Sequence, residues 1–207
     1  MNDHHTSKNF DLELESLRTR VLEMGGLAEQ QVQKAVDGLY SGNKQLLEGV
    51  IRDDDLINRM EIEIDALCNQ IIAKRQRVAD MYRERLSGIP GVKLPQADPN
   101  VTRMSWFVYV IRVGAYEQSH DRQSAVRDHV MQRFQEANIG CRPYFTPIHL
   151  QPYYRDAFGF KEGDFPVTEL AGRTSIAIPF HNHITSDEVD YVAEALERAL
   201  EETRSSR

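Results

Sequence analysis

Two long apolar stripes fill the N-terminal part of this 207-residue chain and constrain its fold more than any other feature. The first stripe runs from Phe10 to Leu39 in alternating steps of three and four residues, which is the period of an amphipathic helix. The second runs from Leu46 to Met81 and predicts a helix of roughly 60 Å at about 1.5 Å per residue. Ser41-Gly42-Asn43 supplies a turn between them. The sequence therefore predicts an antiparallel helical hairpin.

This hairpin requires neighbours. Gly25-Gly26 lies in the middle of the first stripe, and each glycine costs about 1 kcal/mol relative to alanine in a helix. We expect either a closely packed neighbour at this point or a bend. A pair of amphipathic helices also leaves much apolar surface in water, so residues 10–81 are expected to form a homo-oligomer or to bind a helical partner.

The pattern changes after Pro90. Four elements are predicted from here on: a strand over Val101–Val113, a helix over Arg122–Ala137, a buried strand over Thr174–Ile178 and an acidic amphipathic helix over Ser186–Glu202. A loop region rich in Pro, Tyr and Phe is expected between the middle helix and the last strand. The predicted fold class is α+β, with a long helical hairpin over residues 1–76 followed by a small α/β lobe over residues 77–207.

Charge and hydropathy exclude several classes of protein. The net charge is -7, of which residues 1–76 carry -5 (9 Lys+Arg, 14 Asp+Glu) and residues 77–207 carry -2 (16 against 18). Neither part offers the basic surface that nucleic acid requires. No apolar run reaches the 18 or so residues of a membrane span, and the N-terminus has no signal-peptide layout. We expect a cytoplasmic protein without membrane insertion.

Two cysteines, Cys68 and Cys141, are present without the spacing of a zinc site. We expect both to be buried or idle thiols. His181 and His183 form a His-x-His pair that lacks Cys or carboxylate partners at known spacing, so we favour a structural role over metal binding.

The segments DLELESLRTRVLEMGGLAEQQVQKAV and VIRDDDLINRMEIEIDALCNQIIAKRQ resemble the opening helical pair of the PhoU family, accessory regulators of phosphate uptake. The resemblance covers residues 6–76, with Met24-Gly25-Gly26 and Asp53-Asp54-Asp55 as its most specific strings. It implies a cytoplasmic, all-helical protein of two three-helix repeats that restrains phosphate transport and its sensor kinase. The third helix and the second repeat have no counterpart in this sequence.

The PhoU resemblance also implies a metal-binding acidic motif, which Glu61 and Asp65 match. Asp54, Asn58, Glu61 and Asp65 lie at i, i+4, i+7 and i+11, so all four project from one face of a helix. We call these four residues the acidic row. Their oxygen atoms suit a hard divalent cation. The alternative, which we favour without the ligands of a second repeat, is a solvated acidic face.

A second resemblance covers residues 74–203. Arg142-Pro143-Tyr144-Phe145-x-Pro147-x-His149 and Gly163-Asp164-Phe165-Pro166-x-Thr168-Glu169 occur in the order found in the C-terminal lobe of the DegT/DnrJ/StrS-type sugar aminotransferases. This resemblance implies dimeric pyridoxal-phosphate enzymes that aminate keto-sugar nucleotides for polysaccharide, cell-envelope or antibiotic synthesis. The lobe lies over the substrate side, so Tyr144, Phe145 and His149 are the candidate substrate-side residues. A structural role for His149 weighs equally.

The family's chemistry requires a lysine that forms a Schiff base with the cofactor aldehyde, and a phosphate-binding cradle. In this family both belong to the large domain. Lys93 precedes a proline turn and Lys161 lies in a glycine-flanked loop, and neither follows the serine-containing segment that marks the family's lysine. We therefore predict no catalytic residue, no covalently bound cofactor and no transaminase activity for this chain by itself.

Residues 71–76 are compatible with both families and keep the helical apolar phase unbroken. Three functions remain open for this chimera-like sequence. The first is an aminotransferase-related lobe, the second a PhoU-like regulator acting as a helical binding module, and the third a fusion without function.

Overall fold

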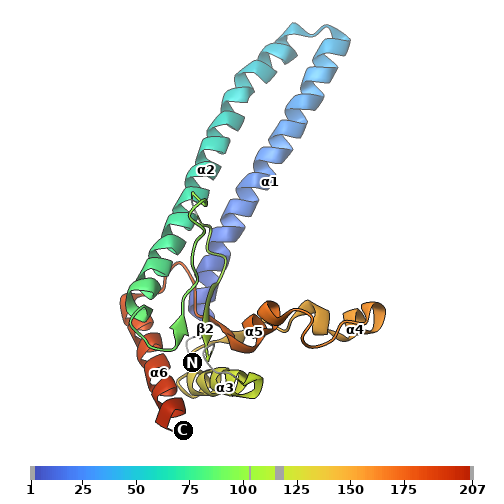
Figure 1. Cartoon of the computed structure of the whole chain (residues 1–207). Coiled ribbons are helices and arrows are strands. Elements are labelled where there is room, and N and C mark those ends of the chain that lie inside the picture. Colours follow the sequence, from blue (N-terminus) through green and yellow to red (C-terminus); the bar gives the residue numbers. More distant parts are fainter. Residues whose placement is uncertain (1–2, 103, 115–118, 206–207) are drawn as a thin grey trace. The chain divides into compact units, whose positions relative to one another are not determined.

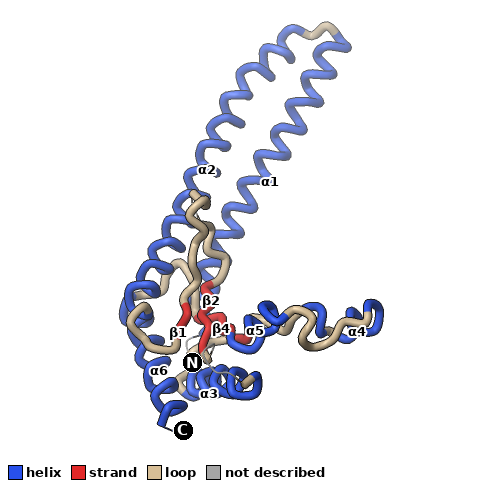
Figure 2. The backbone as a smooth tube through the Cα atoms, viewed as in Figure 1, coloured by secondary structure: helices blue, strands red, loops and turns tan. Residues whose placement is uncertain are grey.

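The computed structural model describes residues 3–102, 104–114 and 119–205, with side chains from Leu12 onward. The chain divides into two compact units, Met1–Lys74 and Arg75–Arg207. The domain boundary that the sequence predicts between residues 76 and 77 stays a prediction. Elements are drawn in Figure 1 and coloured by type in Figure 2.

The first unit is the predicted hairpin of α1 (Asp3–Ser41) and the first part of α2 (Lys44–Leu86). Gly42 turns the chain at φ 67°, which glycine adopts without a Cβ penalty. The side chain of Asn43 then accepts a hydrogen bond from the Leu46 N–H at 3.1 Å and caps α2. Between the helices, Arg20 contacts Glu63 at 2.6 Å and Lys34 contacts Asp53 at 3.3 Å.

The hairpin buries few of its apolar side chains. Among its described side chains Ile64 and Gln31 are the buried ones, whereas eleven large apolar side chains are exposed. Gly25 and Gly26 lie within α1, and a Cβ on either would meet nothing within 4 Å. No described residue of this chain therefore packs closely against these glycines, and the expectation of a neighbour or a bend stays a prediction.

The second unit contains a four-stranded antiparallel sheet in the order β1-β2-β4-β3. Its strands are β1 (Val92–Lys93), β2 (Tyr109–Val113), β3 (Arg142–Pro143) and β4 (Ser175–Ile178), shown in red in Figure 2. The helices are the end of α2, α3 (His120–Glu136), the short η1 (Ile148–Leu150), α4 (Pro152–Phe158), α5 (Pro166–Thr174) and α6 (Ser186–Ser205).

One hydrophobic core holds this unit together. Tyr82 of α2 is fully buried, and its ring stacks on Tyr109 of β2 at 5.1 Å between centroids. Ile111 and Val113 point to the same face of the sheet and are also fully buried, as are Phe134 of α3 and Leu196 of α6. The α+β class and the two helices predicted for this lobe, over Arg122–Ala137 and Ser186–Glu202, are thus confirmed.

Two predictions for this unit were wrong. The strand expected over Val101–Val113 begins only at Tyr109. Trp106 has φ 50°, and its indole is buried with Nε1 donating to Gln76 at 2.8 Å, which takes the chain out of the extended conformation. The expected loop before the last strand contains α4 and α5, each of which has a proline in its first turn.

Candidate functional site

The segment between β3 and α5, together with α5 itself, lines a hollow of about 470 Å³, which we call the aromatic hollow. Its eleven lining residues are mostly apolar and include Tyr144, Phe145, Pro147, Ile148, His149, Tyr154, Phe160 and Phe165. A volume of this size is typical of small-molecule sites, which combine apolar walls with a few polar groups. Here the polar groups are the hydroxyls of tyrosine and Thr168 and the imidazole of His149.

Glu169 of α5 fixes the position of this segment. Its side chain is 1% exposed, and Oε1 lies 3.0 Å from His149 Nε2. The same carboxylate accepts hydrogen bonds from the N–H groups of Gly163 at 2.9 Å and Phe165 at 3.2 Å. It therefore ties η1, the loop before α5 and α5 itself to one buried group, next to the positive end of the helix.

Burial and hydrogen bonding have opposite effects on the pKa of Glu169. Burial alone raises the pKa of a carboxyl group, but the hydrogen bonds from His149 and from the backbone at Phe165 and Gly163 outweigh it and lower the pKa of Glu169. Arg173 Nη1, 3.7 Å from Glu169 Oε2, adds a positive neighbour. The carboxylate is thus held in its charged form.

The structure brings Tyr144, Phe145 and His149 together around this hollow, although their role in substrate binding stays a prediction. The Phe145 side chain is 56% exposed and the Tyr144 ring lies beside it at 4.8 Å. His149 is 7% exposed and packs 4.7 Å from the Phe165 ring, so its imidazole is hydrogen-bonded and packed. Glu169 was missed as a site residue, although an acid in the first turns of a helix that begins at a proline was a usable signal.

The aromatic hollow does not fit pyridoxal phosphate. Its described lining contains no lysine that could form a Schiff base and no carboxylate that could contact a pyridinium nitrogen. Lys93 is in β1 and lines a different hollow. Lys161 is exposed, and its backbone N–H binds Asp164 at 2.9 Å.

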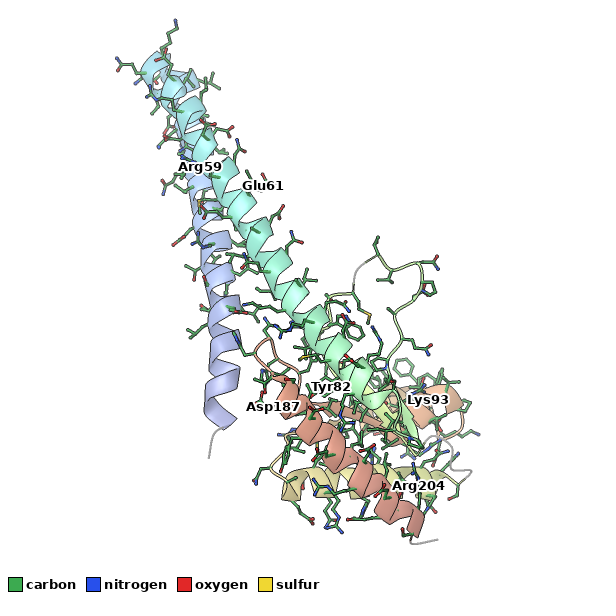
Figure 3. All side chains as sticks on the ribbon, turned by 90° about the vertical axis from the view of Figure 1, so that its left-hand side faces the viewer. Arg59, Glu61, Tyr82, Lys93, Asp187 and Arg204 are labelled. Carbon is green, nitrogen blue, oxygen red and sulfur yellow. The ribbon has the colours of Figure 1, made fainter. Side chains whose placement is uncertain are left out.

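The acidic row lies on the exposed surface of α2, where Glu61 is labelled in Figure 3. Asn58 donates to Asp54 at 3.2 Å. Among the described residues no group of three or more His, Cys, Asp or Glu side chains is placed to hold a metal ion. The carboxylate that sequence reasoning missed is Asp53, where hydrogen bonds from Gln31 and Lys34 of α1 lower the pKa.

Cys68, Cys141 and His181, which the sequence analysis also considered, do not line the aromatic hollow. Cys68 and Cys141 are half-buried free thiols, and burial raises the pKa of Cys141. His181 Nδ1 is buried without a hydrogen-bond partner in the part of the chain that the structure describes, and burial lowers its pKa. No described helix is long and apolar enough to span a membrane. Cytoplasmic location stays a prediction.

Comparison with known proteins finds relatives of two kinds. Residues 21–89 match the PhoU domain, and the PhoU accessory protein of the phosphate-specific transport system of Serratia marcescens is 46% identical over 79 residues (38% of this chain, 32% of that protein). The spore coat polysaccharide biosynthesis protein SpsC of Bacillus subtilis is 27% identical over 188 residues, covering 86% of this chain and 45% of that protein.

A solved structure agrees with the fold. Spr1654 of Streptococcus pneumoniae superposes with a TM-score of 0.60 at 19% identity, over 73% of this chain and 36% of that one. The chain spans about a third to under a half of the length of the curated relatives it matches. The two predicted resemblances are confirmed. Residues 66–197, well over half of the chain, match the aminotransferase profile, and the chain belongs to the DegT/DnrJ/EryC1/StrS aminotransferase family.

Proposed function

We propose that the second unit binds a sugar nucleotide in the aromatic hollow and acts as a substrate-side lobe related to sugar aminotransferases. The observation that carries this proposal is the hollow itself, whose rings are held in place by the buried His149–Glu169 pair. Family membership supplies the ligand class, because this family acts on sugar nucleotides.

The chemistry of the lining suits such a ligand. A nucleobase stacks on aromatic rings, and each such contact is worth about 1 to 3 kcal/mol. Phe145 and Ile148 are more than half exposed, so their apolar faces are available to a planar ring. The hydroxyls of Tyr144 and Thr168 supply hydrogen-bonding groups for a sugar.

We further propose that this chain does not transaminate by itself. The family's reaction uses the aldehyde of pyridoxal phosphate as an electron sink, which requires a lysine anchor. The absence of a lysine from the described lining of the aromatic hollow supports this proposal.

Titration calorimetry with uridine diphosphate N-acetylglucosamine and thymidine diphosphate glucose tests the binding proposal. Phe145→Ala removes an exposed ring and should weaken binding about tenfold, the equivalent of about 1.4 kcal/mol. Phe107→Ala is the matched control, because Phe107 is 78% exposed and does not line the hollow. Equal affinity of the two variants, or no binding to the parent at millimolar ligand, would exclude this function.

A second candidate function rests on the first unit. We propose that the hairpin is a PhoU-like binding module, which its 46% identity to the Serratia marcescens protein over 79 residues supports. Its exposed apolar side chains provide a surface for another helix. A variant of the chain with intact hollow and altered hairpin surface separates the two functions, because only the second depends on that surface.

A further inference from the structure

A second hollow lies over β1, β2 and β4 and shares no lining residue with the aromatic hollow. Its volume is about 500 Å³, and we call it the cationic hollow. Lys93, Arg112 and Ser175 line it together with the amide side chain of Gln96. Its eight described lining residues include no aspartate or glutamate.

The register of the sheet aligns three of these residues. Lys93 of β1 is directly opposite Arg112 of β2, which is directly opposite Ser175 of β4. Directly opposite residues of antiparallel strands point to the same face, so the three side chains form one row across the sheet. Ile111 and Val113, on either side of Arg112, point to the other face and fill the core. The row therefore faces the hollow, which all three residues line. Lys93 is labelled in Figure 3.

The pairing of Lys93 with Arg112 is unfavourable by itself. Like charges directly opposite on neighbouring strands destabilise a sheet. Within the described residues, no ion pair or hydrogen bond engages the side chain of either residue. Arg112 is only partly exposed, so water screens its charge incompletely. A bound anion would remove this repulsion.

We propose that the cationic hollow binds a phosphate group of a small molecule. The guanidinium fork of Arg112 matches two oxygens of a phosphate, and the ammonium group of Lys93 adds a compact charge. Ser175 and Gln96 add hydroxyl and amide donors at the same wall. Arg142, opposite Ala177 on the edge strand β3, points to the same face of the sheet but does not line the hollow, so the site consists of Lys93 and Arg112 with their polar neighbours.

Calorimetry and thermal melting with inorganic pyrophosphate, at ionic strength held constant with sodium chloride, test this proposal. The full chain should bind pyrophosphate and melt at a higher temperature in its presence. Arg112→Gln should weaken binding at least tenfold, and Lys93→Gln should weaken it by a smaller factor. Arg77→Gln is the matched control, since Arg77 is exposed on α2 and loses the same charge outside the hollow.

The variants also give a readout that a purely structural role would not produce. Without pyrophosphate, Arg112→Gln and Lys93→Gln should melt no lower than the parent, because each removes the like-charge pair. An equal response of Arg112→Gln and Arg77→Gln to pyrophosphate would overturn the site, since it would reflect the net charge alone. Citrate bound as tightly as pyrophosphate would overturn the assignment to phosphate.

Discussion

Glu169 shows how one buried residue organises the aromatic hollow. It accepts hydrogen bonds from two backbone N–H groups and pairs with His149, while Arg173 lies within 3.7 Å. A buried carboxylate is tolerated only where such partners replace water. The residues of the hollow are therefore held by a polar group that lies behind them.

The pH dependence of stability follows from this arrangement. The pKa of Glu169 is lowered in the folded chain, so its contribution is complete above the unfolded value of about 4.5 and is lost as the pH falls through the lower folded pKa. Glu169→Gln should melt at a lower temperature than the parent at pH 7, and the difference should shrink towards pH 3. Melting curves across this range test it, and a difference that does not change with pH would contradict it.

Gly172 of α5 gives a second prediction at the scale of one residue. A Cβ here would lie 2.7 Å from Pro147 Cδ and 3.2 Å from the Phe145 carbonyl oxygen, so the wall of the aromatic hollow would have to move. Overpacking of this kind costs about 1 to 3 kcal/mol. Gly172→Ala should therefore lower the free energy of unfolding in urea. Gly140→Ala is the control, because its Cβ would meet nothing within 4 Å, and equal stability of the two variants would refute the prediction.

The lysines allow a third prediction. Pyridoxal phosphate mixed with the chain and reduced with borohydride should leave no stoichiometric adduct on one lysine, because no lysine lines the described aromatic hollow. Peptide mass spectrometry measures the distribution of adducts. Weak labelling spread over exposed lysines is expected, whereas a single fully labelled lysine would show that a cofactor anchor exists.

At the scale of elements, periodicity predicted what depends on local sequence. The ends of α1, α2, α3 and α6 lie within about a turn or two of the expected bounds, because stripes and caps such as Thr185 with Glu188 are local signals. The residue at which β2 begins could not be predicted from local sequence. Trp106 is held outside the strand by hydrogen bonds with Gln76 and Arg75, which are 30 and 31 residues away in the chain. The partners of Glu169 were likewise invisible, because they meet only in the folded segment.

The acidic row of α2 gives a prediction for one element. Carboxylates one turn apart repel by a few tenths of a kcal/mol on an exposed helix, so an ion that bridges them would stabilise the fold and raise the melting temperature. Two hairpins that pair could supply eight oxygen-bearing side chains, four from each row. If the acidic row binds an ion in this way, millimolar divalent ions should raise the melting temperature of the parent slightly, and Glu61→Gln/Asp65→Asn should lose this shift.

The control for this measurement is Glu29→Gln/Glu48→Gln, which removes the same charge from exposed positions outside the row. It should keep the shift of the parent. Identical shifts in all three proteins would leave the acidic row as a solvated face, which is the alternative that we favoured from the sequence.

At the scale of the whole molecule, the two units differ in how completely they bury their apolar residues. Of the 24 hydrophobic residues that are buried in the described part of the chain, all except Ile64 belong to the second unit. A domain normally has a core of its own, and the first unit has almost none among its described residues. From this contrast we propose that another surface packs against the hairpin and stabilises it.

Exposed apolar side chains of α1 offer a candidate for the contact with that surface. Leu14, Val21, Val32 and Leu39 are separated by 7, 11 and 7 residues, which returns each to the same side of a helix. Their exposed fractions are 41%, 43%, 65% and 72%. An apolar row of this length usually marks an interface or an aggregation hazard.

We therefore expect the chain to self-associate through this row. Light scattering at micromolar concentration should give a mass above that of the 23.8 kDa chain. Val32→Ser/Leu39→Ser should shift the mass towards the monomer, because burial of each apolar side chain contributes about 1.5 to 3 kcal/mol to an interface. Leu12→Ser/Leu56→Ser is the control, since both side chains are exposed and neither lies in the row. A stable monomer of the parent would contradict self-association, and equal masses of the two variants would place the contact elsewhere.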